Sequence, residues 1–169
     1  ASASLVLLPT LGALLEEAQA TPRDLTGVCA CVGPGGFTSL RLGVATAEGL
    51  AVTGLPTWGY SAFALRAEAL AGSAAPFWVL LDGQRGEAFH QQWGEGPLTA
   101  AGKTPFLSLG ALIGTEAWWA PESVVPKLAP HLVTPPLDLD DEPAATLAGL
   151  VRLCRRLPLG TPESPLHPF

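Results

Sequence analysis

One stretch of this sequence limits its fold more than any other: an apolar run followed at once by a glycine-rich turn and a helical segment. Residues 28–32, Val-Cys-Ala-Cys-Val, form an uninterrupted apolar run, as expected of a strand that is covered on both faces. Residues 33–36, Gly-Pro-Gly-Gly, predict a turn. Residues 39–52 have helical composition apart from two glycines, and Gly54 and Pro56 end this segment. The order of strand, turn and helix predicts an α/β fold.

The rest of the chain also mixes helical and strand-like segments. Leucines at helical spacing predict a first helix over about residues 8–20, because Pro9 is tolerated only near a helix start. Residues 77–82 and 87–93 are predicted to be two strands of a hairpin, joined by the turn at residues 83–86. The other expected elements are an extended piece around 57–58, helices at 61–70, 107–112 and 144–157, and only short strands between 94 and 143.

Composition excludes several classes of protein. Of the 169 residues, 48% are apolar and only 14% are charged, which excludes an intrinsically disordered chain. The 19 glycines and 17 prolines exclude a mostly helical bundle. No apolar stretch approaches the roughly 20 residues that cross a bilayer. We therefore expect a soluble protein that has no membrane partner.

Charge and cysteine content bear on partners and location. The formal net charge of −6 disfavours a stand-alone nucleic-acid binder, so any RNA is expected to be held by a partner. Arg152, Arg155 and Arg156 share one helical face near a helix C-terminus, where cations interact favourably with the helix dipole; RNA contact is the alternative. Three cysteines without the spacing of a disulfide scaffold fit a reducing compartment, so we expect a cytoplasmic protein.

The glycine turn has two interpretations. Gly33, Gly35 and Gly36 permit positive φ angles and close backbone approach. Together with Thr38 they would place the exposed amides of the next helix around a phosphate. The turn is not a P-loop, because the Lys and Ser/Thr that reach phosphate and magnesium are missing, and it is not a GxGxxG motif. The residues alone leave a structural turn and a phosphate turn both open.

Residues that could carry chemistry are scattered along the chain. His90, His131 and His167 are far apart in the sequence, and Cys29 and Cys31 have no second cysteine pair. Ordinary core or surface positions are the preferred interpretation of all five. No Gly-x-Ser-x-Gly motif is present, which argues against a serine hydrolase of that type. We therefore predict no metal site and no catalytic residues.

Four pieces of the sequence together carry a family resemblance. They are LLPTLGALLEEA at 7–18, the block at 24–51, GLP at 54–56 and LLDGQRGEAF at 80–89. In these pieces the sequence resembles the TsaB family, the bacterial subunit of the machinery that makes threonylcarbamoyladenosine in tRNA, formerly grouped with glycoprotease-like proteins. The family has Ser-Phe-Thr-Gly where this chain has Gly-Phe-Thr-Ser at residues 36–39, a departure that would loosen the turn without changing its role.

The resemblance implies an actin-like ATPase (ribonuclease H-like) architecture with two related α/β domains. We expect the remainder of a first domain at residues 1–71, a smaller second domain at 72–157 and a proline-rich tail at 158–169. The family's opening strands, which carry an Asp-Thr-Ser motif, have no counterpart in this sequence. We therefore expect a first domain that lacks its N-terminal strands, and a sequence that is a fragment.

The resemblance also implies a function. TsaD, the catalytic relative, holds a metal with a His-x-x-x-His stretch just after the equivalent of residues 54–56. Ala62 and Arg66 stand at those positions, and neither side chain can ligate a metal. The resemblance thus implies a non-catalytic scaffold subunit that binds and activates TsaD, with TsaE in the assembly and tRNA bound only indirectly. It implies no cofactor bound by this chain alone, with ATP or ADP confined to the interface with the partner.

Small residues on the helix at 39–52 suggest where a partner would bind. Gly43, Ala47 and Glu48 fall on one side, and the small side chains there would let a second helix approach closely, although ordinary packing inside the subunit is the alternative. In the family, this helix and the preceding one pair with TsaD or with a second TsaB, so we also expect a homodimer in isolation. An alternative function is a nucleotide-binding ATPase or kinase-like enzyme that uses residues 33–38 as its phosphate turn. The expected interface residues are Leu11, Leu15, Leu40, Gly43, Val44, Ala47 and Leu50.

Overall fold

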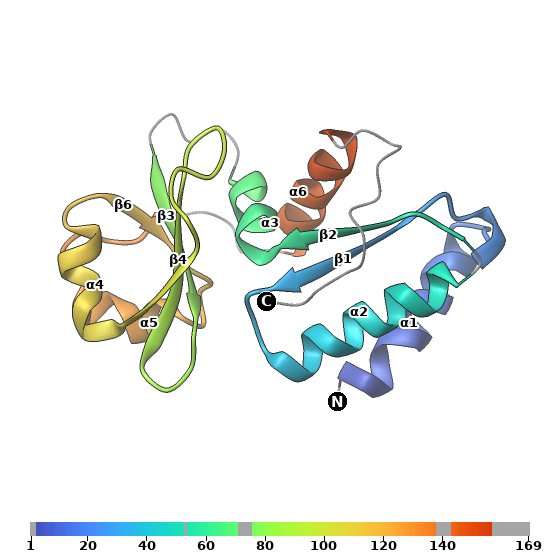
Figure 1. The fold of residues 1–169 in the computed structure, drawn as a ribbon, viewed down its shortest axis with the longest axis horizontal. Coiled ribbons are helices and arrows are strands. Elements are labelled where there is room, and N and C mark those ends of the chain that lie inside the picture. Colours follow the sequence, from blue (N-terminus) through green and yellow to red (C-terminus); the bar gives the residue numbers. More distant parts are fainter. Residues whose placement is uncertain (1–2, 53, 71–75, 138–142, 157–169) are drawn as a thin grey trace. The chain divides into compact units, whose positions relative to one another are not determined.

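The chain forms two compact units that both combine helices with β-strands. The computed structural model describes residues 3–52, 54–70, 76–137 and 143–156 (Figure 1). The boundary between the units lies between Ala62 and Phe63. The α/β class predicted from the sequence is confirmed. None of the described helices has the length and apolar character that crossing a membrane needs.

The first unit is built on a pair of parallel strands joined by a helix. Strand β1 pairs with β2, with Val28 opposite Thr57, and α2 is the crossover that parallel neighbours require. Val44 and Ala47 of α2 pack against Ala30 of β1. The predicted order of strand, glycine turn and helix is confirmed. The elements are α1 (Ala3–Glu17), a 3-10 turn (Pro22–Asp24), β1 (Val28–Gly33), α2 (Phe37–Ala51) and β2 (Thr57–Ser61).

The coverage of β1 differs from the prediction. Within residues 28–32 only Ala30 is buried, and the other four residues are half-buried, so the expectation of a strand covered on both faces is wrong for most of its length. Helix α2 packs against Val28, Ala30 and Val32, and β2 is the only described strand that pairs with β1. An apolar run indicates a strand, but the run cannot show which neighbours cover it.

Helix α1 begins earlier than the sequence predicts. It starts at Ala3, so Pro9 lies inside the helix and not near its start. Proline has no N–H, so the helix lacks the hydrogen bond from residue 9 to the carbonyl of Leu5. Both residues are exposed, so water can donate to that carbonyl instead. The helix ends where Gln19 adopts a left-handed conformation with φ 52°. A capping box then forms, in which Thr21 N donates to Asp24 Oδ2 at 2.8 Å.

The second unit contains a four-stranded sheet with strand order β5-β4-β3-β6. Strands β3 and β4 form the predicted hairpin with the predicted bounds, and Phe77 lies opposite Trp93. At its turn, Gln84 and Arg85 both adopt positive φ angles, 60° and 52°. The elements are α3 (Ala62–Ala69), β3 (Phe77–Asp82), β4 (Glu87–Trp93), β5 (Gly102–Pro105), α4 (Phe106–Ile113), β6 (Ala117–Trp119), α5 (Val125–Leu128), a 3-10 turn (Ala129–His131) and α6 (Pro143–Arg156).

The core of the second unit is rich in tryptophan. Three of the buried indoles find hydrogen-bond acceptors: Trp78 Nε1 donates to Glu116 Oε2, Trp93 Nε1 to Gln91 Oε1 at 3.1 Å, and Trp118 Nε1 to the Thr134 carbonyl at 2.8 Å. These bonds let large side chains be buried without an unsatisfied donor. The core cluster consists of Trp78, Leu80, Ala88, Leu109, Ile113, Trp118, Ala120, Val124 and Leu128.

Helices α3 and α6 meet at a close crossing. A Cβ atom on Gly149 of α6 would lie 2.8 Å from Ala69 N and 2.9 Å from the Leu65 carbonyl oxygen of α3. Arg152 Nε donates to the Glu68 carbonyl at 3.0 Å, and a terminal nitrogen of Arg152 donates to the same oxygen. Arg152 therefore satisfies a carbonyl in the last turn of α3, which is a structural role within the unit.

This crossing explains where the unit boundary falls. The first domain is predicted to end at residue 71, whereas the two compact units divide between Ala62 and Phe63, after the first residue of α3. Contacts between Leu65, Ala69 and Gly149 join α3 to α6 in the second unit. Such contacts join residues about 80 positions apart, so the local sequence pattern does not reveal them. The tail expected at residues 158–169 lies outside the described residues.

Buried His90 on β4 predicts a dependence of stability on pH. Its Nε2 lies 2.9 Å from Thr104 Oγ1 and its ring packs edge-on to Trp78, while burial lowers the pKa of the imidazole below 6.5. The unfolded chain then binds a proton more readily than the folded chain, so stability falls as the pH drops below 6.5. Urea titrations over this range should show that loss, and His90→Gln should flatten it. An unchanged pH profile in the variant would contradict the assignment to His90.

Candidate functional site

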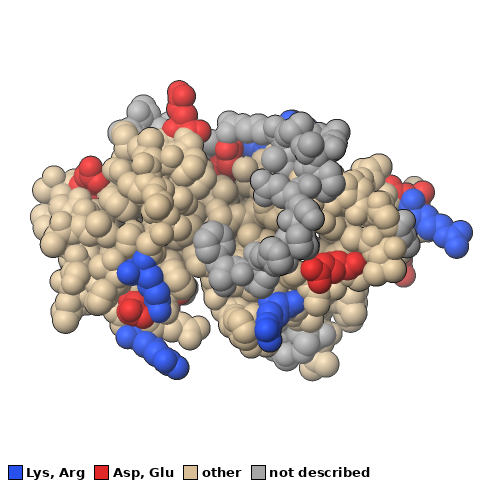
Figure 2. Space-filling model, in the orientation of Figure 1, with Lys and Arg blue, Asp and Glu red and all other residues tan. Residues whose placement is uncertain are grey.

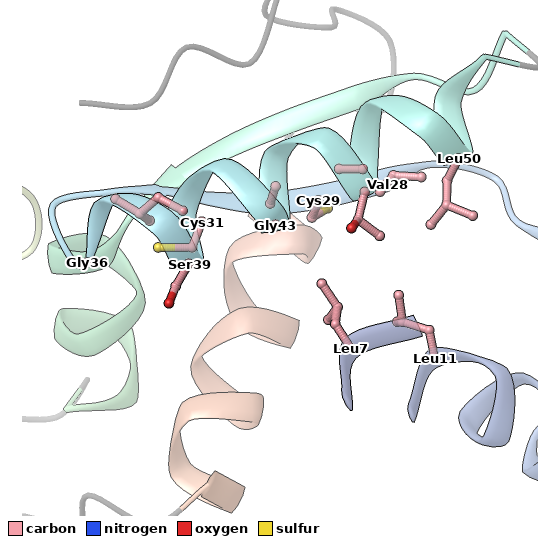
Figure 3. Close-up of a pocket in the computed structure, with 13 residues that line it drawn as sticks. Leu7, Leu11, Val28, Cys29, Cys31, Gly36, Ser39, Gly43 and Leu50 are labelled. Atoms are coloured by element: carbon pink, nitrogen blue, oxygen red, sulfur yellow. The ribbon is translucent and has the colours of Figure 1, made fainter. Parts of the chain in front are cut away.

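An apolar groove of about 410 Å³ lies between helices α1 and α2 beside strand β1 (Figure 3). Leu7 and Leu11 project into it from α1, and Leu50 projects from α2 on the opposite side. The two leucines of α1 are four residues apart, so they lie on one face of the helix. The groove is therefore shaped by the leucine spacing of α1 and by the small residues of α2.

The chemistry of the groove is that of a binding surface. None of the described residues that line it carries a charge, and its hydroxyl groups come from Ser39 and Thr46. The thiols of Cys29 and Cys31 also line it. Such a surface offers apolar area and a few weak hydrogen-bonding groups, which suits the side chains of another protein element. It offers no carboxylate or imidazole for acid–base chemistry.

The groove brings together many of the predicted interface residues, but not all of them. Val44 does not belong to the groove, because it is only 5% exposed and packs on Ala30 in the core. Ala47 is 3% exposed and belongs to the same core cluster, although it also reaches the groove wall. Leu15 is half-buried on α1 and does not line the groove. The predicted residues in the groove lining are Leu11, Leu40, Gly43, Ala47 and Leu50.

Leu7 lines the groove but is not among the predicted interface residues. Leu7 was recognisable from its spacing to Leu11, but the helix was predicted to begin after it. Gly43 is half-buried, and a Cβ atom added to it would meet nothing within 4 Å. The absence of its side chain therefore leaves open space in the groove wall.

The glycine turn sits between β1 and α2. Gly33 has a φ of 114°, which favours glycine, and both Gly33 and Pro34 are buried. Gly35, Gly36 and Thr38 are exposed. The first turn of α2 closes when Leu40 N donates to the Gly36 carbonyl at 3.0 Å, so the amides before Leu40 have no acceptor within the helix. This geometry is compatible with both the structural and the phosphate interpretation.

Ala62 and Arg66, which stand where the sequence comparison places the histidines of the catalytic relative, both lie on helix α3. Ala62 is its first residue, and the guanidinium of Arg66 lies 5.5 Å from the Trp119 ring centre. Within the described ranges, no group of three or more His, Cys, Asp or Glu side chains is arranged to hold a metal ion. His131 packs near Phe106 with ring centres 5.9 Å apart, and His167 lies outside the described residues.

Asp82 at the end of β3 has a turn-forming role. Its carboxylate accepts hydrogen bonds from Lys127 Nζ at 2.5 Å and from the Gln84 amide at 2.8 Å. The hydrogen bond from Lys127 is the main cause that lowers the pKa of Asp82 below its ordinary value. The carboxylate is thus committed to the hairpin turn and to one lysine.

Comparison with known proteins points to one family and one fold. Residues 3–124 match the family described as TsaD, tRNA N6-adenosine threonylcarbamoyltransferase. The structure is similar to YeaZ from Pseudomonas aeruginosa, with a TM-score of 0.73 and 19% identity over 98% of this chain and 83% of that chain. It is also similar to an uncharacterized protein described as similar to peptidase YeaZ from Pseudomonas aeruginosa, with a TM-score of 0.66 and 18% identity over 89% of this chain and 76% of that chain. No curated protein matches the sequence.

These matches confirm the predicted architecture. YeaZ is the TsaB protein and has the actin-like ATPase fold, so the mixed α/β structure with parallel and antiparallel sheets is of that type. The resemblance stated from the sequence motifs is also confirmed.

Proposed function

Because this chain belongs to the TsaD family and is a TsaB-like, glycoprotease-family protein, we propose that it is a non-catalytic subunit that binds and activates TsaD. The family assigns it to the synthesis of threonylcarbamoyladenosine in tRNA. In this proposal TsaD carries out the transfer to tRNA, TsaE completes the assembly, and the present chain touches tRNA only through its partners.

The groove between α1 and α2 is the observation that carries the proposal. Its lining is apolar and uncharged, it is open to solvent, and it lies between two helices of 15 residues each. A helix or loop of TsaD that buried apolar side chains there would gain about 25 cal/mol for each Å² removed from water. The groove thus supports protein binding more strongly than it supports small-molecule chemistry.

Residue chemistry supports a non-catalytic role. Ala62 has no donor atom, and the guanidinium of Arg66 offers only hydrogen-bond donors, so the pair that stands in place of the catalytic relative's histidines has no ligating capacity. The proposal assigns no cofactor to this chain alone. It confines ATP or ADP to the interface with TsaD.

Activation follows from differential affinity. If the groove binds the active conformation of TsaD more tightly than the inactive one, each 1.4 kcal/mol of difference shifts that equilibrium about tenfold toward the active form. No reacting group from this chain is needed for such an effect. The contribution of the chain is to stabilise a conformation of its partner.

The proposal predicts that transfer activity requires both proteins. Threonylcarbamoyl transfer to tRNA is measured with the adenylate donor and TsaD, with this chain, or with both. We expect little product from TsaD, none from the chain and at least about tenfold more from the mixture than from TsaD. Turnover by the chain alone would show instead that it is an enzyme.

Binding of Mg-ATP by the isolated chain in calorimetry would favour the nucleotide-binding alternative.

A further inference from the structure

The groove between α1 and α2 carries two thiols. Cys29 and Cys31 lie on β1, and both are half-buried and line the groove. Neither is part of a disulfide. The other polar side chains of the described lining are the hydroxyls of Ser39 and Thr46. Because a thiol is a far stronger nucleophile than a hydroxyl near neutral pH, the two cysteines are the positions where this groove can form a covalent bond.

The groove has room for a small molecule beside these thiols. Figure 3 shows both cysteine side chains among the residues that line it. A Cβ atom on Gly43, which also lines the groove, would meet nothing within 4 Å, so α2 leaves open space there. The volume of about 410 Å³ lies within the range of about 300–1,000 Å³ that is typical of small-molecule sites. A compound of modest size can therefore reach the sulfur atoms.

The lining selects apolar compounds over charged ones. Acidic and basic side chains are scattered over the face of the molecule in Figure 2, whereas none of the described lining residues is charged. An apolar compound gains free energy when it leaves water for such a surface, and a charged compound loses its hydration. Without a cation in the lining to favour the thiolate, reaction depends on a compound that first binds in the groove and is held next to the sulfur.

We propose that Cys29 and Cys31 are covalent modification sites for small apolar α,β-unsaturated carbonyl compounds. In the reaction Sγ forms a bond to the β carbon of the compound, and the electron pair of the carbon–carbon double bond moves to the α carbon. The α carbon takes up a proton, which replaces the one that the thiol gives up. No oxidant and no leaving group takes part, so the addition needs only the thiol and the compound.

Modification would also control docking, and this part of the inference rests on the proposed function. An adduct on either sulfur occupies groove volume that a segment of TsaD needs. The carbon–sulfur bond remains after the excess compound is removed, so the block outlasts the exposure. The groove would then respond to reactive apolar compounds as well as to its partner.

Labelling of the full chain tests the modification. N-phenylmaleimide is compared with N-(4-carboxyphenyl)maleimide, which has the same reactive group and nearly the same size but carries a negative charge. Peptide mapping by mass spectrometry gives the rate at each cysteine. In the folded chain the uncharged reagent should react at least about tenfold faster at Cys29 and Cys31, and this preference should disappear in urea. Cys154 on α6 does not line the groove and should not show the preference.

Calorimetric titration with TsaD tests the effect on docking. After labelling with N-phenylmaleimide and removal of the excess, the chain should bind TsaD at least about tenfold more weakly. The double variant Cys29→Ser, Cys31→Ser is compared with itself and should have the same affinity before and after treatment. Cys154→Ser is the matched control and should lose affinity on treatment as the unchanged chain does. Circular dichroism shows whether each variant is folded.

Each part of the proposal can fail separately. The modification is contradicted if both groove cysteines stay unlabelled in the folded chain, or if the preference for the uncharged reagent is the same in urea. Control of docking is contradicted if the fully labelled chain binds TsaD with unchanged affinity. If the untreated chain does not bind TsaD, the proposed function fails and control of docking fails with it, while the labelling rates still decide whether the groove accepts the reagent.

Discussion

Gly43→Trp should abolish binding to TsaD while the chain stays folded. Gly43 lies in the groove wall with no atom within 4 Å of its Cβ position, so an indole can enter the groove without striking the backbone. Tryptophan is also a better helix former than glycine, so α2 itself should not be weakened. The side chain would occupy space that the partner needs. Calorimetric titration should show affinity reduced by about a hundredfold or more, which corresponds to about 2.7 kcal/mol.

The matched control for this experiment is Gly12→Trp. Gly12 is also a helical glycine with open space at its Cβ position, but it is exposed on α1 and does not line the groove. It should bind TsaD as the unchanged chain does. Ala47 is not a suitable position, because it is packed against Ala30 and a large side chain there would disrupt the core. Equal affinity of the Gly43 and Gly12 variants would show that the groove is not the binding surface.

Gly149→Leu should unfold the second unit or leave it barely stable. The atoms that its Cβ would strike, Ala69 N and the Leu65 carbonyl oxygen, are backbone atoms of α3 and cannot rotate away. Helix α6 would have to move off α3, and the hydrogen bonds from Arg152 to the Glu68 carbonyl would be lost. Overpacking with backbone displacement together with these bonds should cost about 3 kcal/mol or more, a large part of a typical domain stability.

Urea denaturation followed by tryptophan fluorescence measures this loss, because the second unit buries Trp78, Trp118 and Trp119. Ala148→Leu is the control: it adds a similar side chain at the neighbouring position of α6, where the residue is exposed. Its denaturation midpoint should stay close to that of the unchanged chain. If both variants had the same midpoint, the close crossing of α3 and α6 would not be a determinant of stability.

The parts of the fold that were predictable are those encoded locally. The hairpin strands at 77–82 and 87–93 have the predicted bounds, because apolar runs and a glycine-flanked turn mark them directly. The strand, turn and helix around residues 28–52 were predictable for the same reason. The coverage of β1 and the burial of Val44 were not predictable, because they depend on contacts between distant segments. The hydrogen bond from Arg152 to α3 joins distant segments in the same way.

The candidate site was predictable only in part. Of the predicted interface residues, Leu11, Leu40, Gly43, Ala47 and Leu50 line the groove, and their contact with a partner stays a prediction. The sequence could not show which side of α2 would face β1, since glycine and alanine suit both a core and an open wall.

The uncharged lining of the groove has a consequence for selectivity. A site without fixed charges or strong donors has little means of rejecting a wrong apolar segment, because no buried polar group is left unpaired by the mistake. Selection between partner segments must then come from the shape of the groove. The open space at Gly43 and the side chains of Leu7 and Leu11 admit some partner side chains and exclude bulkier ones. Another protein with an apolar segment of similar shape would therefore bind the groove with similar affinity.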